Sequence, residues 1–144
     1  MESKSPLKEL KDPLTAASSP ILLKVSGLKT HFFLEEGIVK AVDGVDFTVR
    51  RGETLGIVGE SGCGKSMTGL SIMGLLPNGG HVVGGSIKFE GRELVGMPSH
   101  ELRSIRGNDI SMIFQDSASS LNPTKTIGVQ VAEPVVLHRR ASKK

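Results

Sequence analysis

A short glycine-rich run, Gly59 to Ser66, carries the clearest chemical pattern in this sequence. It reads GESGCGKS: a Gly, four residues, a second Gly, then Lys and Ser. This spacing is typical of loops that bind the phosphates of a nucleotide. Gly59, Gly62 and Gly64 permit positive φ and a close backbone approach, so that amide N–H groups can point at phosphate oxygens. The run therefore predicts binding of a nucleotide phosphate chain.

Two side chains of the run are predicted to act directly. Lys65 is placed to reach the β- and γ-phosphates, and the Ser66 hydroxyl is placed to bind Mg²⁺, a hard cation that prefers oxygen ligands. The Glu60 side chain is predicted to point to solvent. The full predicted nucleotide-binding set of this segment is Gly59, Glu60, Ser61, Gly62, Cys63, Gly64, Lys65, Ser66 and Met67.

A phosphate loop needs a strand before it and a helix after it. The apolar run Glu53–Val58 is of strand length, and Met67–Leu76 reads as a helix. Ahead of the loop, alternating segments separated by turn residues predict a small antiparallel sheet. Its expected strands are Ile21–Val25, Leu28–Leu34, Ile38–Val42 and Val45–Arg50, with turns at Ser26–Gly27, Glu35–Gly37 and Asp43–Gly44.

The rest of the chain predicts shorter elements. Strands are expected at Ser86–Phe89 and Asp109–Phe114, the second buried and leading to Gln115. Helices are expected at His100–Ile105, where Ser99 is a candidate cap, and at Thr126–Leu137, where Pro134 interrupts. Residues 1–20 mix Ser, Pro, Lys and Ala without periodicity and are predicted to form a flexible tail.

The composition of the chain argues against several classes of function. A chain of 144 residues with net charge +3 suits one small domain. Basic residues gather at the C-terminus rather than along one element, so no nucleic-acid partner is predicted. The single cysteine, Cys63, excludes an intramolecular disulfide. No run approaches the roughly 20 apolar residues of a membrane span, and no secretion signal stands at the N-terminus. We therefore expect a cytoplasmic protein that meets a membrane only through partners.

Three segments together resemble the ATP-binding cassette (ABC) ATPases, and within them the ATPase subunits of oligopeptide and dipeptide importers. The segments are GESGCGKS at Gly59–Ser66, MIFQD at Met112–Asp116 and SLNPTKTIGVQVAEP at Ser120–Pro134, together with the preface Ala41–Ser66. The resemblance covers about residues 21–137. It implies an α/β fold with an incomplete P-loop NTPase (RecA-like) core and an N-terminal antiparallel β subdomain. Residues 21–144 then form an incomplete nucleotide-binding domain after the tail 1–20.

The resemblance also implies roles for single residues. Gln115 matches the glutamine that contacts Mg²⁺ and the attacking water and couples the site to transmembrane subunits. The implied catalytic residues are thus Lys65 and Gln115, and the implied metal ligands are Ser66 and Gln115. Phe32 stands where the family carries an aromatic residue that stacks on adenine, with Phe33 as the alternative. A core position in the small sheet explains Phe32 equally well.

Cofactors and partners follow from the same resemblance. ATP and Mg²⁺ are the implied ligands. The implied partners are transmembrane permease subunits and a second nucleotide-binding subunit, in a homo- or heterodimer on the inner face of the plasma membrane. The transported substrate is most simply a peptide.

The family's remaining motifs are not in this sequence. LSGGQ, an apolar strand ending in Asp followed by Glu, and a switch His are all missing from the 144 residues. Phosphoryl transfer depends on positioned charges and a positioned water, so this chain alone is expected neither to hydrolyse ATP usefully nor to fold well. Apolar sheet edges are expected to stay unpaired. The alternatives are a non-catalytic module that docks transmembrane or full-length ATPase subunits, another P-loop enzyme such as a small-molecule kinase, and a gene fragment without activity.

Overall fold

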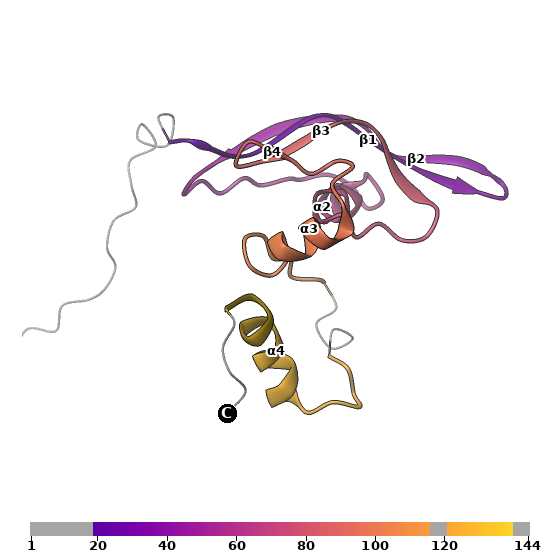
Figure 1. Cartoon of the computed structure of the whole chain (residues 1–144). Coiled ribbons are helices and arrows are strands. Elements are labelled where there is room, and N and C mark those ends of the chain that lie inside the picture. The colour runs from indigo at the N-terminus through magenta and orange to yellow at the C-terminus, as the bar shows by residue number, and fades with distance from the viewer. Residues whose placement is uncertain (1–18, 116–120, 140–144) are drawn as a thin grey trace, which may run out of the picture.

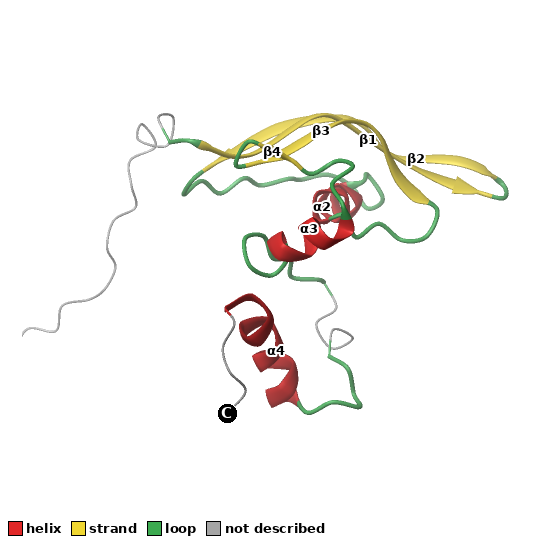
Figure 2. Cartoon of the chain, viewed as in Figure 1, coloured by secondary structure: helices red, strands yellow, loops and turns green. Residues whose placement is uncertain are grey.

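The computed structural model describes residues 19–115 and 121–139. A four-stranded antiparallel sheet of order β2-β1-β3-β4 forms one layer, and helices α2 and α3 pack beneath it (Figure 1). The elements are β1 (Ile21–Leu34), β2 (Gly37–Arg50), α2 (Lys65–Met73), β3 (Gly80–Phe89), β4 (Arg92–Glu93), α3 (Ser99–Ile105) and α4 (Ile127–Arg139). Figure 2 shows a long connection without regular structure between β2 and α2. The predicted tail lies outside the described residues, apart from its last two.

The predicted antiparallel sheet ahead of the phosphate loop is confirmed, but its strands are longer than expected. Four predicted short strands are two continuous ones, β1 and β2, paired from Ile21↔Arg50 to Leu34↔Gly37. The predicted turns at Gly27 and Gly44 are irregularities within the strands, with φ of 55° and 84°. A glycine at positive φ forms a β-bulge as readily as a reversal, and the Gly27 N–H is held by Asp46 Oδ1 at 2.8 Å.

The core lies between the sheet and the two helices. Its buried apolar residues are Val25, Leu28, Val42, Ile87, Phe89, Leu94 and Ile105. One buried polar contact joins the layers, a 2.8 Å hydrogen bond between the hydroxyls of Thr30 on β1 and Ser71 on α2. Because a buried hydroxyl without a partner is costly, this pair fixes where α2 rests on the sheet. The phosphate-loop helix is therefore anchored on β1.

The predicted helices are present with shifted ends. Helix α2 starts at Lys65 and ends at Met73, short of the predicted end at Leu76, and Gly74 is its C-cap with φ 60°. Pro98 rather than Ser99 is the N-cap of α3, and Ser99 is its first helical residue. Helix α4 continues through Pro134, which the prediction took as an interruption.

Two predicted strands do not form. Residues 53–58 and 111–114 have no strand pairing, and Val58 and Ile113 are 93% and 95% exposed. A strand exists only where a neighbouring backbone accepts its hydrogen bonds. Within the described ranges no strand runs beside either segment, so their apolar side chains face solvent. Residues 53–58 and 111–114 thus leave apolar backbone segments unpaired at two places where the sequence predicted strands.

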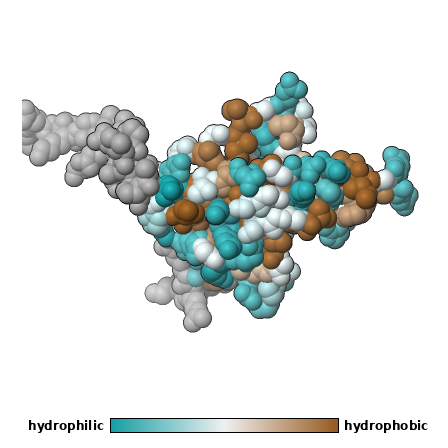
Figure 3. All heavy atoms as spheres, turned by 90° about the horizontal axis from the view of Figure 1, so that it is seen from above, coloured by the Kyte–Doolittle hydropathy of each residue, from teal (hydrophilic) through white to brown (hydrophobic). Residues whose placement is uncertain are grey.

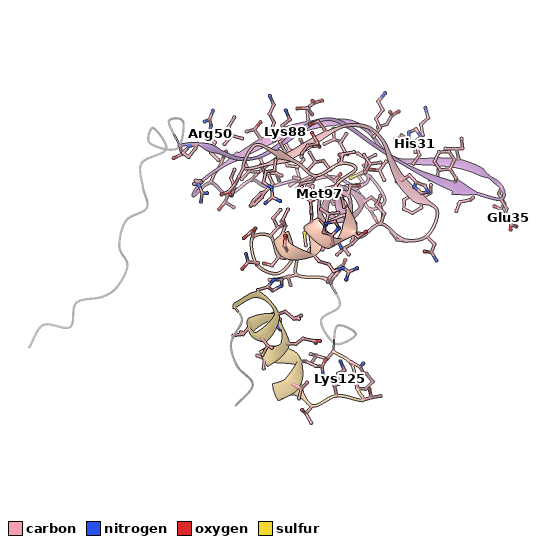
Figure 4. All side chains as sticks on the ribbon, in the orientation of Figure 1. His31, Glu35, Arg50, Lys88, Met97 and Lys125 are labelled. Atoms are coloured by element: carbon pink, nitrogen blue, oxygen red, sulfur yellow. The ribbon has the colours of Figure 1, made fainter. Side chains whose placement is uncertain are left out.

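The outer part of the β1–β2 hairpin also exposes apolar side chains. Phe33, Leu34, Ile38 and Val39 are each about half exposed or more. Figure 3 shows a hydrophobic band near this end of the molecule, with hydrophilic atoms at the extreme tip. Figure 4 places Glu35 at that tip. The hairpin reaches past α2 and α3, so no other described element covers its end.

Glu93 on β4 joins β3 to the segment that follows β4. Its carboxylate accepts hydrogen bonds from the Ser86 hydroxyl and from the N–H groups of Ile87 and Val95, the latter two at 2.9 and 3.1 Å. Partial burial raises the pKa of Glu93, but these three hydrogen bonds and the charge of Lys88 outweigh it, so the net pKa is lowered. The folded state therefore favours the ionised form.

This linkage predicts a pH effect on stability. A carboxylate whose pKa is lowered on folding stabilises the fold above its unfolded pKa, and that contribution is lost as pH falls through the folded pKa. We expect the free energy of unfolding to drop below about pH 4.5 in the wild type. In Glu93→Gln the drop should be smaller, because the titrating group is gone. Urea unfolding at a series of pH values measures this. The exposed Glu101→Gln variant is the control, and equal pH profiles for Glu93→Gln and wild type would contradict the assignment.

Candidate functional site

The glycine-rich run folds into a compact loop that leads directly into α2. Gly62 and Gly64 adopt φ of 83° and 93°, as predicted for the loop. Gly59 does not use the positive φ that the prediction allowed, but its surroundings are crowded. A Cβ at this position would lie 2.6 Å from the Sγ atom of Cys63. A side chain at Gly59 would therefore have to displace the exposed Cys63 side chain.

Gly64 is the most constrained of these glycines. It is the N-cap of α2, and a Cβ there would lie 2.3 Å from the carbonyl oxygen of Ala41 on β2. No side chain fits between the loop and the strand at that distance. The start of α2 is thus pressed against the edge strand of the sheet, which fixes the direction in which the helix N-terminus points.

The first turn of α2 presents free amide groups. Among the hydrogen bonds of the described residues, the first from this turn to a helix carbonyl is Thr68 N–H to Gly64 O at 2.8 Å. The N–H groups of Lys65, Ser66 and Met67 have no such acceptor, as expected for a helix N-terminus. No acidic residue stands in the first turn. The positive end of the helix dipole is therefore available to an anion.

The Lys65 ammonium lies across the loop. Its Nζ donates to the carbonyl oxygens of Gly59 at 2.7 Å and Glu60 at 2.6 Å, and lies 3.4 Å from the Sγ of Cys63. The positive charge is thus held beside the loop that precedes the free N–H groups of α2. The ammonium and the free N–H groups together make a concentrated anion-binding surface.

Ser66 and Gln115 supply oxygen donors of the kind that Mg²⁺ takes. Both residues are exposed, and neither side chain has a hydrogen bond to another described residue. No group of three or more His, Cys, Asp or Glu that suits a metal occurs in the parts of the chain that are described. A hydroxyl, an amide oxygen and phosphate oxygens fit Mg²⁺, which is commonly held by few protein ligands. Ser66 stands at the start of α2, and Gln115 ends the described stretch that follows α3.

The remaining predicted residues lie at different places. Met67 is half-buried and packs on the hydrophobic core, so it supports the loop from below. Phe32 is half-buried on β1, and its ring fills the space that a Cβ of Gly80 would take, at 2.7 Å. Phe33 is 49% exposed, with its ring centroid 5.9 Å from that of His81. Phe32 is not among the residues of the hydrophobic core or those packed against it, so both interpretations of Phe32 stay open, and base stacking by either residue stays a prediction.

Comparison with solved structures gives the fold class. The chain matches the dimeric structure of MJ0796, a bacterial ABC transporter cassette, with a TM-score of 0.74 and 24% identity. It also matches a post-hydrolysis state of that cassette bound to ADP and Pi, with a TM-score of 0.71 and 23% identity. In both cases the match covers 85% of this chain and 50% of the cassette. The fold is that of about half of an ABC transporter cassette.

Sequence comparison gives the family. The ABC transporter family matches residues 42–143, and the chain belongs to that family. It is 52% identical over 124 residues to a probable peptide ABC transporter ATP-binding protein of Sinorhizobium fredii, covering 85% of this chain and 37% of the relative. It is 48% identical over 131 residues to the oligopeptide transport ATP-binding protein OppD of Escherichia coli, covering 91% and 39%. The chain thus spans well under half the length of the curated relatives it matches.

Proposed function

We propose that this chain is the nucleotide-binding part of the ATP-binding subunit of an ABC importer for peptides. The observation that carries the proposal is the loop Gly59–Ser66 at the N-terminus of α2, with its free amides and overlying Lys65. The relatives that share about half of its residues are named as oligopeptide or dipeptide transport proteins. Peptides are therefore the first substrate class to test.

In this role the described residues bind and orient ATP. The amides of the first turn of α2 and the Lys65 ammonium hold the phosphates, and Ser66 with Gln115 would hold Mg²⁺, which neutralises charge on the phosphates when bound. Gln115 is the implied link to transmembrane subunits. The partners proposed are permease subunits and a second nucleotide-binding subunit, at the cytoplasmic face of the membrane. Within the described residues no helix is long and apolar enough to cross a bilayer.

Hydrolysis needs groups that these 144 residues do not supply. The sequence contains neither an acidic pair after an apolar strand nor LSGGQ. Removal of one preorganised electrostatic group costs about 10²- to 10³-fold in rate, and here several are missing. We therefore propose that the chain alone binds nucleotide without sustained turnover.

A second candidate function rests on α4. The side chains of Ile127, Val131 and Leu137 are each about two-thirds exposed, so this helix presents apolar surface that a membrane subunit could cover. A docking module without catalysis would use that surface and not the phosphate loop. The family assignment, in turn, disfavours the small-molecule kinase alternative.

The test is peptide uptake in the native source. Lys65→Ala, introduced at the natural locus, should abolish dipeptide or oligopeptide uptake if ATP binding drives transport. The exposed Lys24→Ala on β1 is the matched control and should leave uptake unchanged. Normal uptake in the Lys65→Ala strain, with the permease still co-purifying, would overturn the proposal in favour of the docking module.

A further inference from the structure

The Arg106 side chain makes hydrogen bonds to the C-terminal end of the phosphate-loop helix, α2. Its Nε donates to the carbonyl oxygen of Met73 and its Nη2 to that of Gly74, both at 2.6 Å. These two carbonyls belong to the last turn and cap of α2, where backbone acceptors lack partners within the helix and the dipole is negative. A planar guanidinium presents several donors in a fixed fork, which suits two adjacent acceptors.

The backbone of Arg106 is tied to the segment that leads to Gln115. Its own N–H donates to Leu102 O at the end of α3, and Arg106 forms an isolated parallel bridge with Ile110. The turn between them is closed by Gly107 N–H to Ile110 O at 2.8 Å. Arg106 therefore connects two parts of the fold. Its side chain binds the end of α2, and its main chain is part of the turn before Ser111–Gln115.

A second contact gives the direction of that segment. The Cε atom of Met112 lies 3.5 Å from where a Cβ on Gly69 would be, near the middle of α2. Arg106 contacts the helix at Gly74, and Met112 contacts it at Gly69. The second contact point therefore lies about 7 Å nearer to the N-terminus of the helix than the first. Three further residues span up to about 10 Å, and Ser66 is about one helical turn beyond Gly69. A segment that continues in this direction from Met112 carries Gln115 toward the loop end of α2.

We propose that Arg106 is a positioning residue that sets the place of Gln115 relative to the phosphate loop. Two attachments on one rigid helix, Arg106 at its end and Met112 at its middle, fix the line along which residues 111–115 run. Without the guanidinium the first attachment is lost, and the course of residues 111–115 along the helix is no longer fixed at its start. This inference rests on the proposed function, because it assigns Gln115 to the metal of a bound nucleotide.

The experiment compares ATP binding with Mg²⁺ and with EDTA. Arg106→Gln should leave the affinity measured in EDTA within about twofold of wild type, because the loop itself is intact. The gain in affinity on adding Mg²⁺ should fall by about tenfold, the size of one lost charged hydrogen bond. Arg106→Lys should be intermediate, since an ammonium keeps the charge but not the fork. Arg103→Gln, an exposed arginine of α3, is the matched control and should match wild type.

A double-mutant cycle separates positioning from general destabilisation. In a Gln115→Ala background, Arg106→Gln should have no further effect on the Mg²⁺-dependent gain, because the residue it positions is gone. An equal effect in both backgrounds, or equal weakening with Mg²⁺ and with EDTA, would overturn the proposal.

Hydrogen exchange keeps the inference testable apart from nucleotide binding. If the wild type binds no ATP under either condition, the proposed function fails, and amide exchange then decides the role of Arg106. Arg106→Gln should speed exchange of the hydrogen-bonded amides of residues 107–110, which form the turn before Ser111–Gln115, while leaving those of β1 and β2 unchanged. Unchanged exchange at 107–110, or faster exchange throughout the sheet, would contradict a positioning role.

Discussion

Replacing Gly64 with alanine should abolish nucleotide binding and lower the free energy of unfolding by about 3 kcal/mol. The left-handed conformation of this residue costs a Cβ-bearing side chain roughly 1–2 kcal/mol. The added Cβ would also lie 2.3 Å from the Ala41 carbonyl oxygen, so the loop and β2 must separate, at a further cost of about 1–3 kcal/mol. That separation turns the N-terminus of α2 away from its present direction. Urea unfolding and equilibrium ATP binding measure the two effects.

Gly62 provides the matched control. It has a similar φ of 83°, but a Cβ there would meet no atom within 4 Å. Gly62→Ala should therefore carry only the dihedral cost of roughly 1–2 kcal/mol. Equal losses of stability in the two variants would show that contact with Ala41 does not constrain the loop.

Lys65→Ala should weaken ATP binding by about 10- to 100-fold, the equivalent of roughly 1.5–3 kcal/mol for a hydrogen bond to a charged group. The Lys65 residue is half-buried, and we propose that its ammonium contacts the terminal phosphates of bound ATP. AMP lacks those phosphates, so its affinity should change much less. Competition binding with a fluorescent ATP analogue measures both ligands.

The exposed Lys24→Ala variant controls for loss of a positive charge elsewhere. It should bind ATP and AMP as the wild type does. A Lys65→Ala variant that loses ATP and AMP affinity to the same degree would contradict contact with the terminal phosphates.

Local sequence signals predicted the loop and the sheet before it. The spacing of Gly59 to Ser66 and the start of a helix just after it depend on short-range chemistry, and both are present. The alternation Val45, Phe47, Val49 placed a strand correctly for the same reason. Sequence alone did not reveal that Gly27 and Gly44 form bulges, because a glycine at positive φ serves either a bulge or a turn. Only pairing with the neighbouring strand decides between them.

Long-range partners explain what could not be predicted. The apolar runs at 53–58 and 109–114 have the composition of buried strands, yet burial depends on neighbouring strands that the described chain does not place beside them. The contact between Arg106 and α2 could not be predicted from the sequence either, because a single arginine after a short helix is usually solvated. Its role depends on two carbonyl oxygens more than thirty residues away in sequence, Met73 O and Gly74 O.

Covalent labelling of Cys63 tests most directly whether the loop Gly59–Ser66 binds nucleotide. Cys63 is the only cysteine of the chain and is exposed, with its Sγ 3.4 Å from Lys65 Nζ, so a thiol reagent reports on this loop alone. At an ATP concentration ten times the dissociation constant, the rate of maleimide modification should fall about tenfold, because only the free protein reacts. Modification that is equally fast with and without ATP, up to the concentrations found in cells, would contradict nucleotide binding at this loop.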